Sequence, residues 1–219
     1  MPEPKTYLAD VVALLRQEWP ANRTVNIVCH GHSVPSGYFQ TPVVDTFNAY
    51  PHLLHQALKE RFPFAVVNVI VTAIGGENSV QGAERFARDV LAVRPDVVTI
   101  DYSLNDRGLG LAAARAAWSG MIAQALAVKA KVILLTPTAD LASNLEDPAD
   151  PLNQHAAQVR ALAQAFDVAL VDSLASFRQR VMDDANLPDL MSQGNHPNRA
   201  GHDLVVRELL PWLPGPLSA

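Results

Sequence analysis

Four kinds of residue in this sequence together have the chemistry of acyl transfer. They are a serine, a glycine pair, an asparagine and a histidine: Ser33, Gly75 and Gly76, Asn105, and His196. Acyl transfer needs a nucleophile, a base that accepts its proton and donors that hold the oxyanion. A hydroxyl, an imidazole, and main-chain and side-chain amides meet those needs. The set therefore indicates a nucleophilic serine, provided that the fold brings its members together.

Each of these residues alone has an ordinary structural explanation. A serine after a strand usually caps a helix, a glycine pair usually marks a tight turn, and an asparagine is common in turns. His196 is less ordinary, because Pro197 keeps it extended at the start of a helix. Whether the four are functional depends on where the secondary structure places them.

Five short β-branched runs predict the strands of one sheet: residues 25–29, 66–72, 97–102, 132–136 and 168–171. Each run is nearly all apolar, which is typical of strands covered on both faces. Helical spacing lies between them, in residues 6–19, 51–58, 80–91, 111–125, 153–166, 174–183 and 198–212. This alternation predicts a parallel sheet between two helical layers, in which ligands bind outside the carboxyl ends of the strands. The serine, the glycine pair and the asparagine each follow one of the first three strands, and the histidine precedes the last helix.

In this order the candidate residues resemble the four sequence blocks of the SGNH/GDSL hydrolase superfamily. The matching stretches read Gly31-His32-Ser33, Gly75-Gly76-Glu77-Asn78-Ser79, Ser103-Leu104-Asn105-Asp106 and His196-Pro197-Asn198. The resemblance extends from about residue 24 to the C-terminal helix. It implies a three-layer α/β/α sandwich with a central five-stranded parallel sheet, flavodoxin-like in arrangement. We expect a single domain over residues 1–219, with residues 1–20 forming an added N-terminal helix.

The resemblance also implies ester hydrolysis through an acyl-enzyme. Ser33 would attack the carbonyl after losing its proton to His196. The main-chain amides of Ser33 and Gly76 and the side-chain amide of Asn105 would hold the oxyanion. Gly75 is the alternative donor, because a double glycine leaves the register ambiguous by one residue.

The chain departs from the superfamily pattern at two positions. His32 stands where the first block usually has aspartate, and Gln193 stands three residues before His196, where the triad acid is usual. We expect the Gln193 carbonyl oxygen to accept from the His196 ring and orient it without supplying charge. A Ser-His dyad, an acid borrowed from Asp106 or Asp189, and an inactive site are the alternatives, of which the dyad is favoured. On that view Gln193→Asp raises activity or leaves it unchanged.

The expected substrates are short-chain carboxylic esters, with O-acetylated carbohydrate first. Tyr38, in the loop after Ser33, is expected to bind substrate together with Gly75 and Gln193, and Phe39 can line the same surface. The polar segment 137–151 follows the fourth strand and forms either a substrate rim or an ordinary surface loop. A lysophospholipase, a thioesterase or an acyltransferase would use the same four blocks. A non-catalytic ligand- or glycan-binding protein is the alternative from another class, whereas a nucleotide-binding domain lacks its phosphate loop.

The composition and the residue counts argue against several classes of partner and site. Of 219 residues, 49% are hydrophobic, which is ample for a core, and the formal charge of −5 gives no reason to expect a nucleic-acid partner. Cys29 is the single cysteine and is expected to be buried, so a disulfide within the chain and a cysteine-based zinc site are excluded. One His30-x-His32 pair provides too few ligands for a metal, and no cofactor is expected. We expect a soluble, cytoplasmic protein without a membrane span, with His202 on the surface; the oligomeric state stays open.

Overall fold

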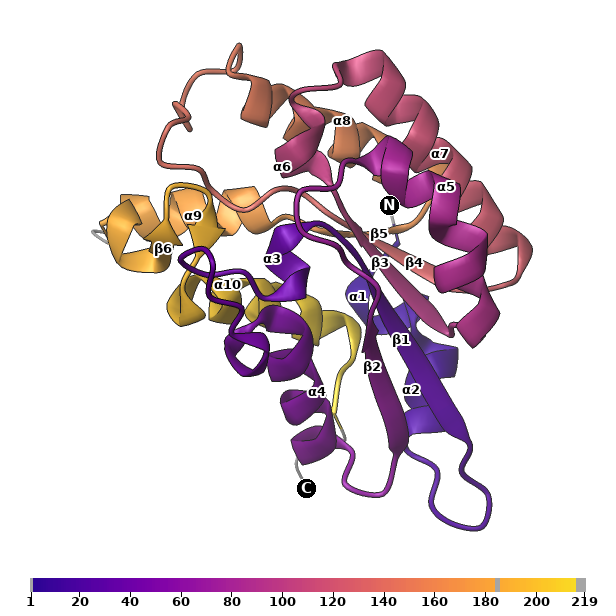
Figure 1. Cartoon of the computed structure of the whole chain (residues 1–219). Helices are drawn as coiled ribbons and strands as arrows, with labels where there is room; N and C mark the ends of the chain where they lie inside the picture. The colour runs from indigo at the N-terminus through magenta and orange to yellow at the C-terminus, as the bar shows by residue number, and fades with distance from the viewer. Residues whose placement is uncertain (1, 184–185, 216–219) are drawn as a thin grey trace.

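The computed structural model, which describes residues 2–183 and 186–215, is built on a five-stranded parallel sheet (Figure 1). Its strands are β1 (Thr24–Gly31), β2 (Val66–Val71), β3 (Val97–Asp101), β4 (Lys131–Leu135) and β5 (Ala169–Val171). They lie in the order β2-β1-β3-β4-β5, the flavodoxin-like order, with every neighbouring pair parallel. The predicted fold is confirmed, and each of the five predicted runs forms a strand whose ends fall within two residues of the expected ones.

Helices cover both faces of the sheet (Figure 1). One layer contains α5 (Ser79–Asp89), α7 (Leu111–Ala127) and α8 (Pro151–Phe166), and the other contains α2 (Ala9–Leu15), α4 (Tyr50–Arg61), α9 (Ser173–Met182) and α10 (Arg199–Leu209). Successive side chains of β3 point to opposite faces, so that Val97 packs in one core and Val98 in the other. Both faces of the strand are therefore apolar, which explains why the runs are continuous rather than alternating.

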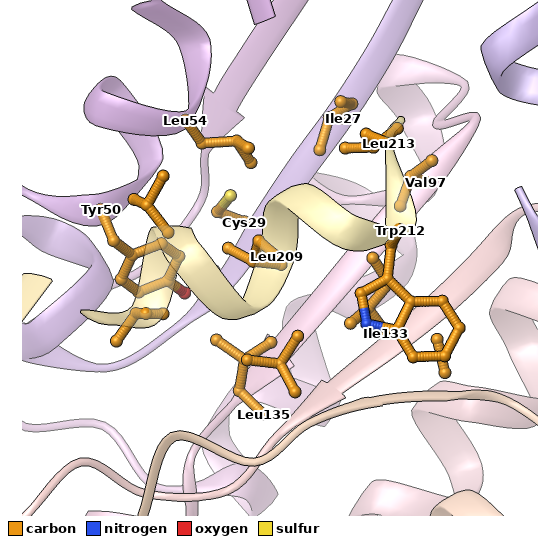
Figure 2. Close-up of a cluster of buried hydrophobic side chains, with 14 of the residues drawn as sticks. Ile27, Cys29, Tyr50, Leu54, Val97, Ile133, Leu135, Leu209, Trp212 and Leu213 are labelled. Atoms are coloured by element: carbon orange, nitrogen blue, oxygen red, sulfur yellow. The ribbon is translucent and has the colours of Figure 1, made fainter. Parts of the chain in front are cut away.

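The core beneath α4 and α10 includes the end of the described chain (Figure 2). Trp212, in the short helix η4 (Leu210–Trp212), and Leu213 are both buried there beside strand residues. Cys29 lies in the same core at 0% exposure, and burial raises the pKa of its thiol to about 12. A thiol with so high a pKa is a poor nucleophile, as expected for a buried cysteine.

The N-terminal segment forms two short helices rather than one. The chain breaks at Leu8 between α1 (Pro4–Tyr7) and α2, and the buried stripe of α2 ends at Leu15. The prediction that Trp19 continues this stripe is wrong, because its side chain is 84% exposed. Tyr7 packs edge-on against Trp212, with ring centroids 6.0 Å apart, so the segment covers the end of the described chain. In the described residues, no helix is long and apolar enough to span a membrane.

Several short elements were not predicted by the sequence. They are α3 (Ser33–Ser36), η1 (Thr46–Asn48), η2 (Leu91–Val93), α6 (Ser103–Asp106), η3 (Leu187–Leu190), and the antiparallel pair β6 (Met191–Gln193) and β7 (His196–Pro197). Of these, α3 follows the carboxyl end of β1 and α6 that of β3, whereas η2 lies between α5 and the amino end of β3. Elements of two to four residues are too short to show a period of hydrophobic residues, which is why the sequence missed them.

Candidate active site

Ser33 begins α3 directly after the end of β1. A Cβ atom on Gly31 would come within 2.4 Å of the Asp101 carbonyl oxygen, so only glycine allows β1 and β3 to approach this closely. The His32 amide donates to the same carbonyl at 3.2 Å. These contacts hold the Ser33 turn against the end of β3, and Ser33 is 7% exposed.

His196 contacts Ser33 from the opposite end of the sequence. Its Nε2 lies 2.9 Å from the Ser33 Oγ, and its Nδ1 lies 2.8 Å from the main-chain carbonyl oxygen of Phe39. A carbonyl oxygen only accepts, so Nδ1 carries the proton and Nε2 presents a lone pair to the Ser33 hydroxyl. This tautomer allows His196 to act as a general base towards Ser33.

The environment of His196 keeps the ring unprotonated at neutral pH. Burial lowers the pKa of His196 from its ordinary 6.5, electrostatic coupling to the neighbouring His32 ring acts in the same direction, and the hydrogen bond to Phe39 opposes both. A general base must be unprotonated to act, so the lowered pKa suits this role.

The expectation that Gln193 accepts from the His196 ring is wrong. The Gln193 Oε1 instead accepts from the main-chain N–H of Thr41 at 2.8 Å and from the Thr41 hydroxyl at 2.9 Å. The loop that carries Phe39 and Thr41 folds back on itself, with Tyr38 bridged to Val44. The Phe39 carbonyl oxygen lies at the Nδ1 of His196, where the carboxylate of a triad acid would be expected. The Gln193 side chain therefore contacts the loop that orients His196 and not the His196 ring.

The two alternative acids do not reach the ring either. The buried Asp106 carboxylate accepts from the Ser79 amide at 2.8 Å and from the Trp118 indole at 2.7 Å. These bonds anchor the start of α5 and the middle of α7. Asp189 is exposed, and its main-chain carbonyl accepts from Asn198 at 2.8 Å. Neither of these two carboxylates is therefore the acid partner of His196 that the sequence left open.

The glycine pair and Asn105 meet at the end of β2 and β3. Gly76 has a φ of 83°, a left-handed conformation that favours glycine, in the turn before α5. The Asn105 side-chain amide donates one hydrogen to the Glu77 carbonyl at 2.8 Å, which leaves its second hydrogen available. Gly75 has a different reason to be glycine, because a Cβ there would lie 2.7 Å from the ring of Tyr38. That ring also lies beside His196, with centroids 6.1 Å apart.

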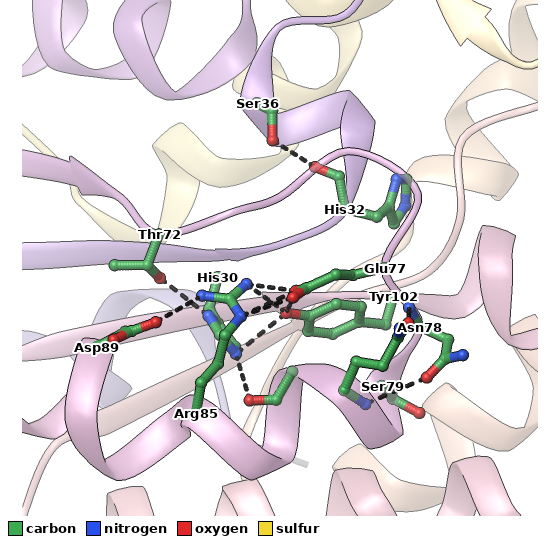
Figure 3. A network of polar contacts seen from close by, with 12 residues as sticks. His30, His32, Ser36, Thr72, Glu77, Asn78, Ser79, Arg85, Asp89 and Tyr102 are labelled. Carbon is green, nitrogen blue, oxygen red and sulfur yellow. Dashed lines mark hydrogen bonds and ion pairs between the residues drawn. The ribbon is translucent and has the colours of Figure 1, made fainter.

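A buried polar network that the sequence did not reveal lies behind this turn (Figure 3). The Arg85 Nε contacts both carboxylate oxygens of Glu77, at 3.0 and 2.9 Å, and its Nη1 contacts Asp89 at 3.2 Å. Tyr102 bonds to Arg85 and, at 3.1 Å, to the Nε2 of His30. Burial and the charge of Arg85 lower the pKa of His30 to about 4. His30 belongs to this network, and no group of three or more His, Cys, Asp or Glu in residues 2–183 and 186–215 could hold a metal.

An open cleft of about 680 Å³ adjoins the oxyanion side of the site. The residues that line it include Gly76, Asn105, Arg107, Ser143, Asp150 and Pro151. The segment 137–151 therefore contributes to its rim. Arg107 is held by the Leu104 carbonyl, the Ser143 hydroxyl and the Asp140 carboxylate, at 2.8, 3.2 and 2.6 Å. These bonds use three of its five N–H groups, so two remain for a ligand.

His202 is also part of the structure around the base, although it was expected on the surface. It is 0% exposed, its Nδ1 accepts from the Tyr50 amide at 3.2 Å, and its ring stacks on Phe39 with centroids 5.2 Å apart. Burial lowers the pKa of His202 to about 3, so the ring is neutral. The expectation failed because the partners of His202 come from segments about 150 residues away in the sequence.

Comparison with known proteins agrees with this geometry. The model of the GDSL-like Lipase/Acylhydrolase family matches residues 29–204. No curated protein sequence matches the chain. Among solved structures, Axe2, an acetylxylan esterase from Geobacillus stearothermophilus, is 22% identical over 86% of this chain and 94% of its own, with a TM-score of 0.75. CEX, a two-domain esterase active on acetylated mannans, is 21% identical over 95% of this chain and 52% of its own, with a TM-score of 0.76.

The two structural likenesses establish the fold. The family match extends over most of the chain, from β1 into α10, and includes Ser33, Asn105 and His196. The protein therefore belongs to the GDSL-like lipase/acylhydrolase family and is a carboxylic ester hydrolase.

Proposed function

We propose that this protein is a serine esterase that removes short acyl groups, acetyl first, from carbohydrate. Ser33 is the nucleophile and His196 the base, without a triad carboxylate. The observation that carries this proposal is the 2.9 Å contact between the Ser33 Oγ and the His196 Nε2, in a ring whose Nδ1 is bonded to Phe39. Nucleophile, base and orienting group thus stand in the relation that acyl transfer requires.

The reaction follows from these positions. His196 takes the Ser33 proton as the Oγ bonds to the ester carbonyl carbon, and the carbonyl oxygen becomes an oxyanion. His196 then gives the proton to the departing alcohol oxygen, which leaves an acyl-serine. Water attacks this ester in the same way, with His196 again accepting and returning the proton, and the carboxylic acid and free Ser33 are released.

The oxyanion is held by the main-chain amides of Ser33 and Gly76 and the free hydrogen of the Asn105 amide. Removing one such donor typically lowers kcat by about 10²–10³. We expect this loss for Asn105→Ala. Asn105→Asp should be at least as damaging, because a carboxylate repels the oxyanion.

Two features support a short acyl group on a sugar. The Tyr38 ring fills the space over Gly75 beside His196, which limits the room for an acyl chain. The cleft beside Asn105 is open and contains polar side chains, with unused guanidinium N–H groups on Arg107 that suit hydroxyl oxygens. Axe2 is an acetylxylan esterase and CEX is active on acetylated mannans, and both share this fold.

The test is fluorophosphonate labelling followed by ester hydrolysis. We expect stoichiometric labelling at Ser33, located by mass spectrometry, and faster hydrolysis of p-nitrophenyl acetate than of the octanoate. Ser33→Ala should abolish both, whereas Ser119→Ala, on α7, is the matched control. Acetate release from acetylated xylo-oligosaccharides and manno-oligosaccharides then identifies the sugar. Because the pKa of His196 is lowered, kcat/KM should fall only below pH 6.5, as the ring takes up a proton.

The outcomes separate the alternatives. Faster octanoate hydrolysis would contradict the short-acyl proposal and favour a lysophospholipase or a thioesterase. A folded protein that resists labelling but binds acetylated oligosaccharide would be a binding protein instead.

A further inference from the structure

A buried Asp–His pair lies behind Ser33. The His32 Nε2 is 3.3 Å from the Asp101 Oδ1, and the two side chains are 1% and 3% exposed. His32 follows β1 and Asp101 ends β3, the two strands on either side of the point where the sheet order reverses. Neither residue takes part in the Arg85 network, and Figure 3 shows His32 apart from it.

The position of the proton on the His32 ring follows from its contacts. The Nδ1 accepts the main-chain N–H of Val34 at 3.2 Å, so it presents a lone pair and the proton lies on Nε2. The Nε2 lies 3.3 Å from the Asp101 Oδ1 but outside hydrogen-bond geometry, so the contact between the two side chains is electrostatic. The same Nδ1 is 3.4 Å from the Ser33 Oγ. Ser33 therefore lies between two imidazoles, and the shorter contact, 2.9 Å, is to His196. The longer contact to His32 is too weak to compete for the Ser33 proton.

The tautomer of His32 matters for Ser33. A proton on Nδ1 would point at the Val34 N–H and would lose the cap on the first turn of α3. It would also donate to the Ser33 Oγ, which would make the oxygen a weaker nucleophile. The Asp101 carboxylate disfavours this tautomer, because its negative charge 3.3 Å from Nε2 favours a proton on that nitrogen.

The residue type at position 32 is linked to the carboxylate at position 101. The groups that face the Asp101 carboxylate are the His32 ring, the Tyr50 hydroxyl of α4 at 3.5 Å and the Cys29 thiol of β1. An aspartate at position 32, which is usual in the superfamily, would bring two carboxylates together in a buried space where both cannot ionise. The carboxylate stands on the neighbouring strand here, which favours a residue before Ser33 that places a proton rather than a negative charge beside it.

We propose that Asp101 and His32 are positioning residues for Ser33. Asp101 fixes the tautomer of His32, and His32 holds the first turn of α3 so that the Ser33 hydroxyl faces His196. This role rests on the proposed function of Ser33 as nucleophile. It assigns the buried Asp101 carboxylate, at the end of β3, to a task different from that of a triad acid.

The experiment compares three variants by the rate of fluorophosphonate labelling at Ser33. Asp101→Asn should slow labelling by about tenfold or more and His32→Asp by about a hundredfold, by analogy with the loss of a tautomer-fixing carboxylate. The double variant His32→Asp/Asp101→Asn restores a carboxylate next to a donor amide and should come back to within about tenfold of the wild type. Asp203→Asn, on α10, is the control, and thermal melts confirm that each variant is folded.

A spectroscopic measurement tests the His32 tautomer without an activity assay. In protein labelled with ¹⁵N-histidine, His32 should show a protonated Nε2 and an unprotonated Nδ1, and Asp101→Asn should perturb that pattern. Wild-type labelling rates in Asp101→Asn, a double variant no faster than the single ones, or a proton on Nδ1 in the wild type would overturn the proposal. An unlabelled wild type would instead overturn the function of Ser33 itself, and with it this role.

Discussion

At the residue scale, the unusual feature is that His196, the proposed base, is oriented by a main-chain carbonyl. The Phe39 oxygen fixes the tautomer of His196, which is one task of a triad carboxylate. It carries only a partial charge, so it stabilises the imidazolium formed during attack less than a carboxylate would. Orientation is retained while part of the charge stabilisation is lost.

Gln193 acts on this arrangement through Thr41. Gln193→Leu removes both hydrogen bonds to Thr41 and frees the loop that presents the Phe39 carbonyl, so kcat should fall between about tenfold and a hundredfold. Gln193→Glu keeps an acceptor oxygen at the same reach and should retain most of the activity. Measuring kcat and KM of both variants with p-nitrophenyl acetate checks this prediction.

The shorter Gln193→Asp decides between two views of this position. Since Phe39 already occupies the Nδ1 of His196, we now expect no gain from a carboxylate at 193. A rise in kcat would mean that the carboxylate displaces the carbonyl and that Gln193 only fills the place of a triad acid.

The proximity of Ser33 and His196 could be expected from the sequence, because the order of residue types relative to the strands carries that signal. The Phe39 acceptor could not, because every residue has a carbonyl. Asp101 was equally hidden, as one polar residue ending an apolar strand. Its role depends on the neighbouring strand, which the sequence order does not reveal.

At the scale of elements, the turn between β2 and α5 depends on Arg85. The guanidinium holds the Glu77 carboxylate while the Glu77 carbonyl holds Asn105, so one salt bridge supports the oxyanion side of the site. Arg85→Met leaves Glu77 without its partner in a largely buried place and should destabilise the fold by about 3 kcal/mol.

The same variant should lower kcat more than it raises KM, because the oxyanion donors serve the transition state. Arg88→Met is the matched control, since Arg88 is on the same helix and its side chain is 76% exposed. Equal kinetic losses in the two variants would show that the turn keeps its shape without Arg85.

The segment after β4 forms the other side of the cleft through Arg107. Arg107→Met removes a charged donor, and the loss of kcat/KM on an acetylated xylo-oligosaccharide should exceed the loss on p-nitrophenyl acetate by about tenfold. Arg115→Met, on the exposed side of α7, should change neither rate. Parallel losses on both substrates would place Arg107 outside the sugar contact.

The long helices and strands could be predicted because the burial of one or both faces produces a recognisable pattern of apolar residues along the sequence. Strand 97–101 and helix 111–127 follow directly from their apolar residues. The elements at the site, α3, α6 and the β6–β7 pair, could not, because capping and tertiary contacts rather than a period determine them.

At the scale of the whole molecule, buried histidines make stability depend on pH. The folded-state pKa of His202, about 3, and of His30, about 4, lie below the ordinary 6.5. Between these values and 6.5 the unfolded chain binds protons that the folded chain does not, so the free energy of unfolding falls as the pH falls. At pH 4 the contribution of His202 alone amounts to about 3 kcal/mol relative to pH 7.

Denaturant unfolding at pH 7, 5.5 and 4 measures this slope. The His202→Asn variant keeps an acceptor for the Tyr50 amide but does not titrate, so its slope should be smaller. His52→Asn, at a partly exposed position on α4, should keep the wild-type slope. A slope unchanged in His202→Asn would mean that this ring titrates in the folded protein as freely as in the unfolded chain.

The β6–β7 hairpin has a further consequence for the lifetime of the active form. It spans only residues 191–197, and its tip is held by the bond from the Leu141 amide to the Gly194 carbonyl, 2.7 Å, and by Gln193 on Thr41. So short a pair has little stability of its own. Local opening of the hairpin removes His196 from Ser33 while the five-stranded sheet stays folded. The catalytic state is thus a subset of the folded state. As the denaturant concentration rises, activity should be lost before the five-stranded sheet unfolds.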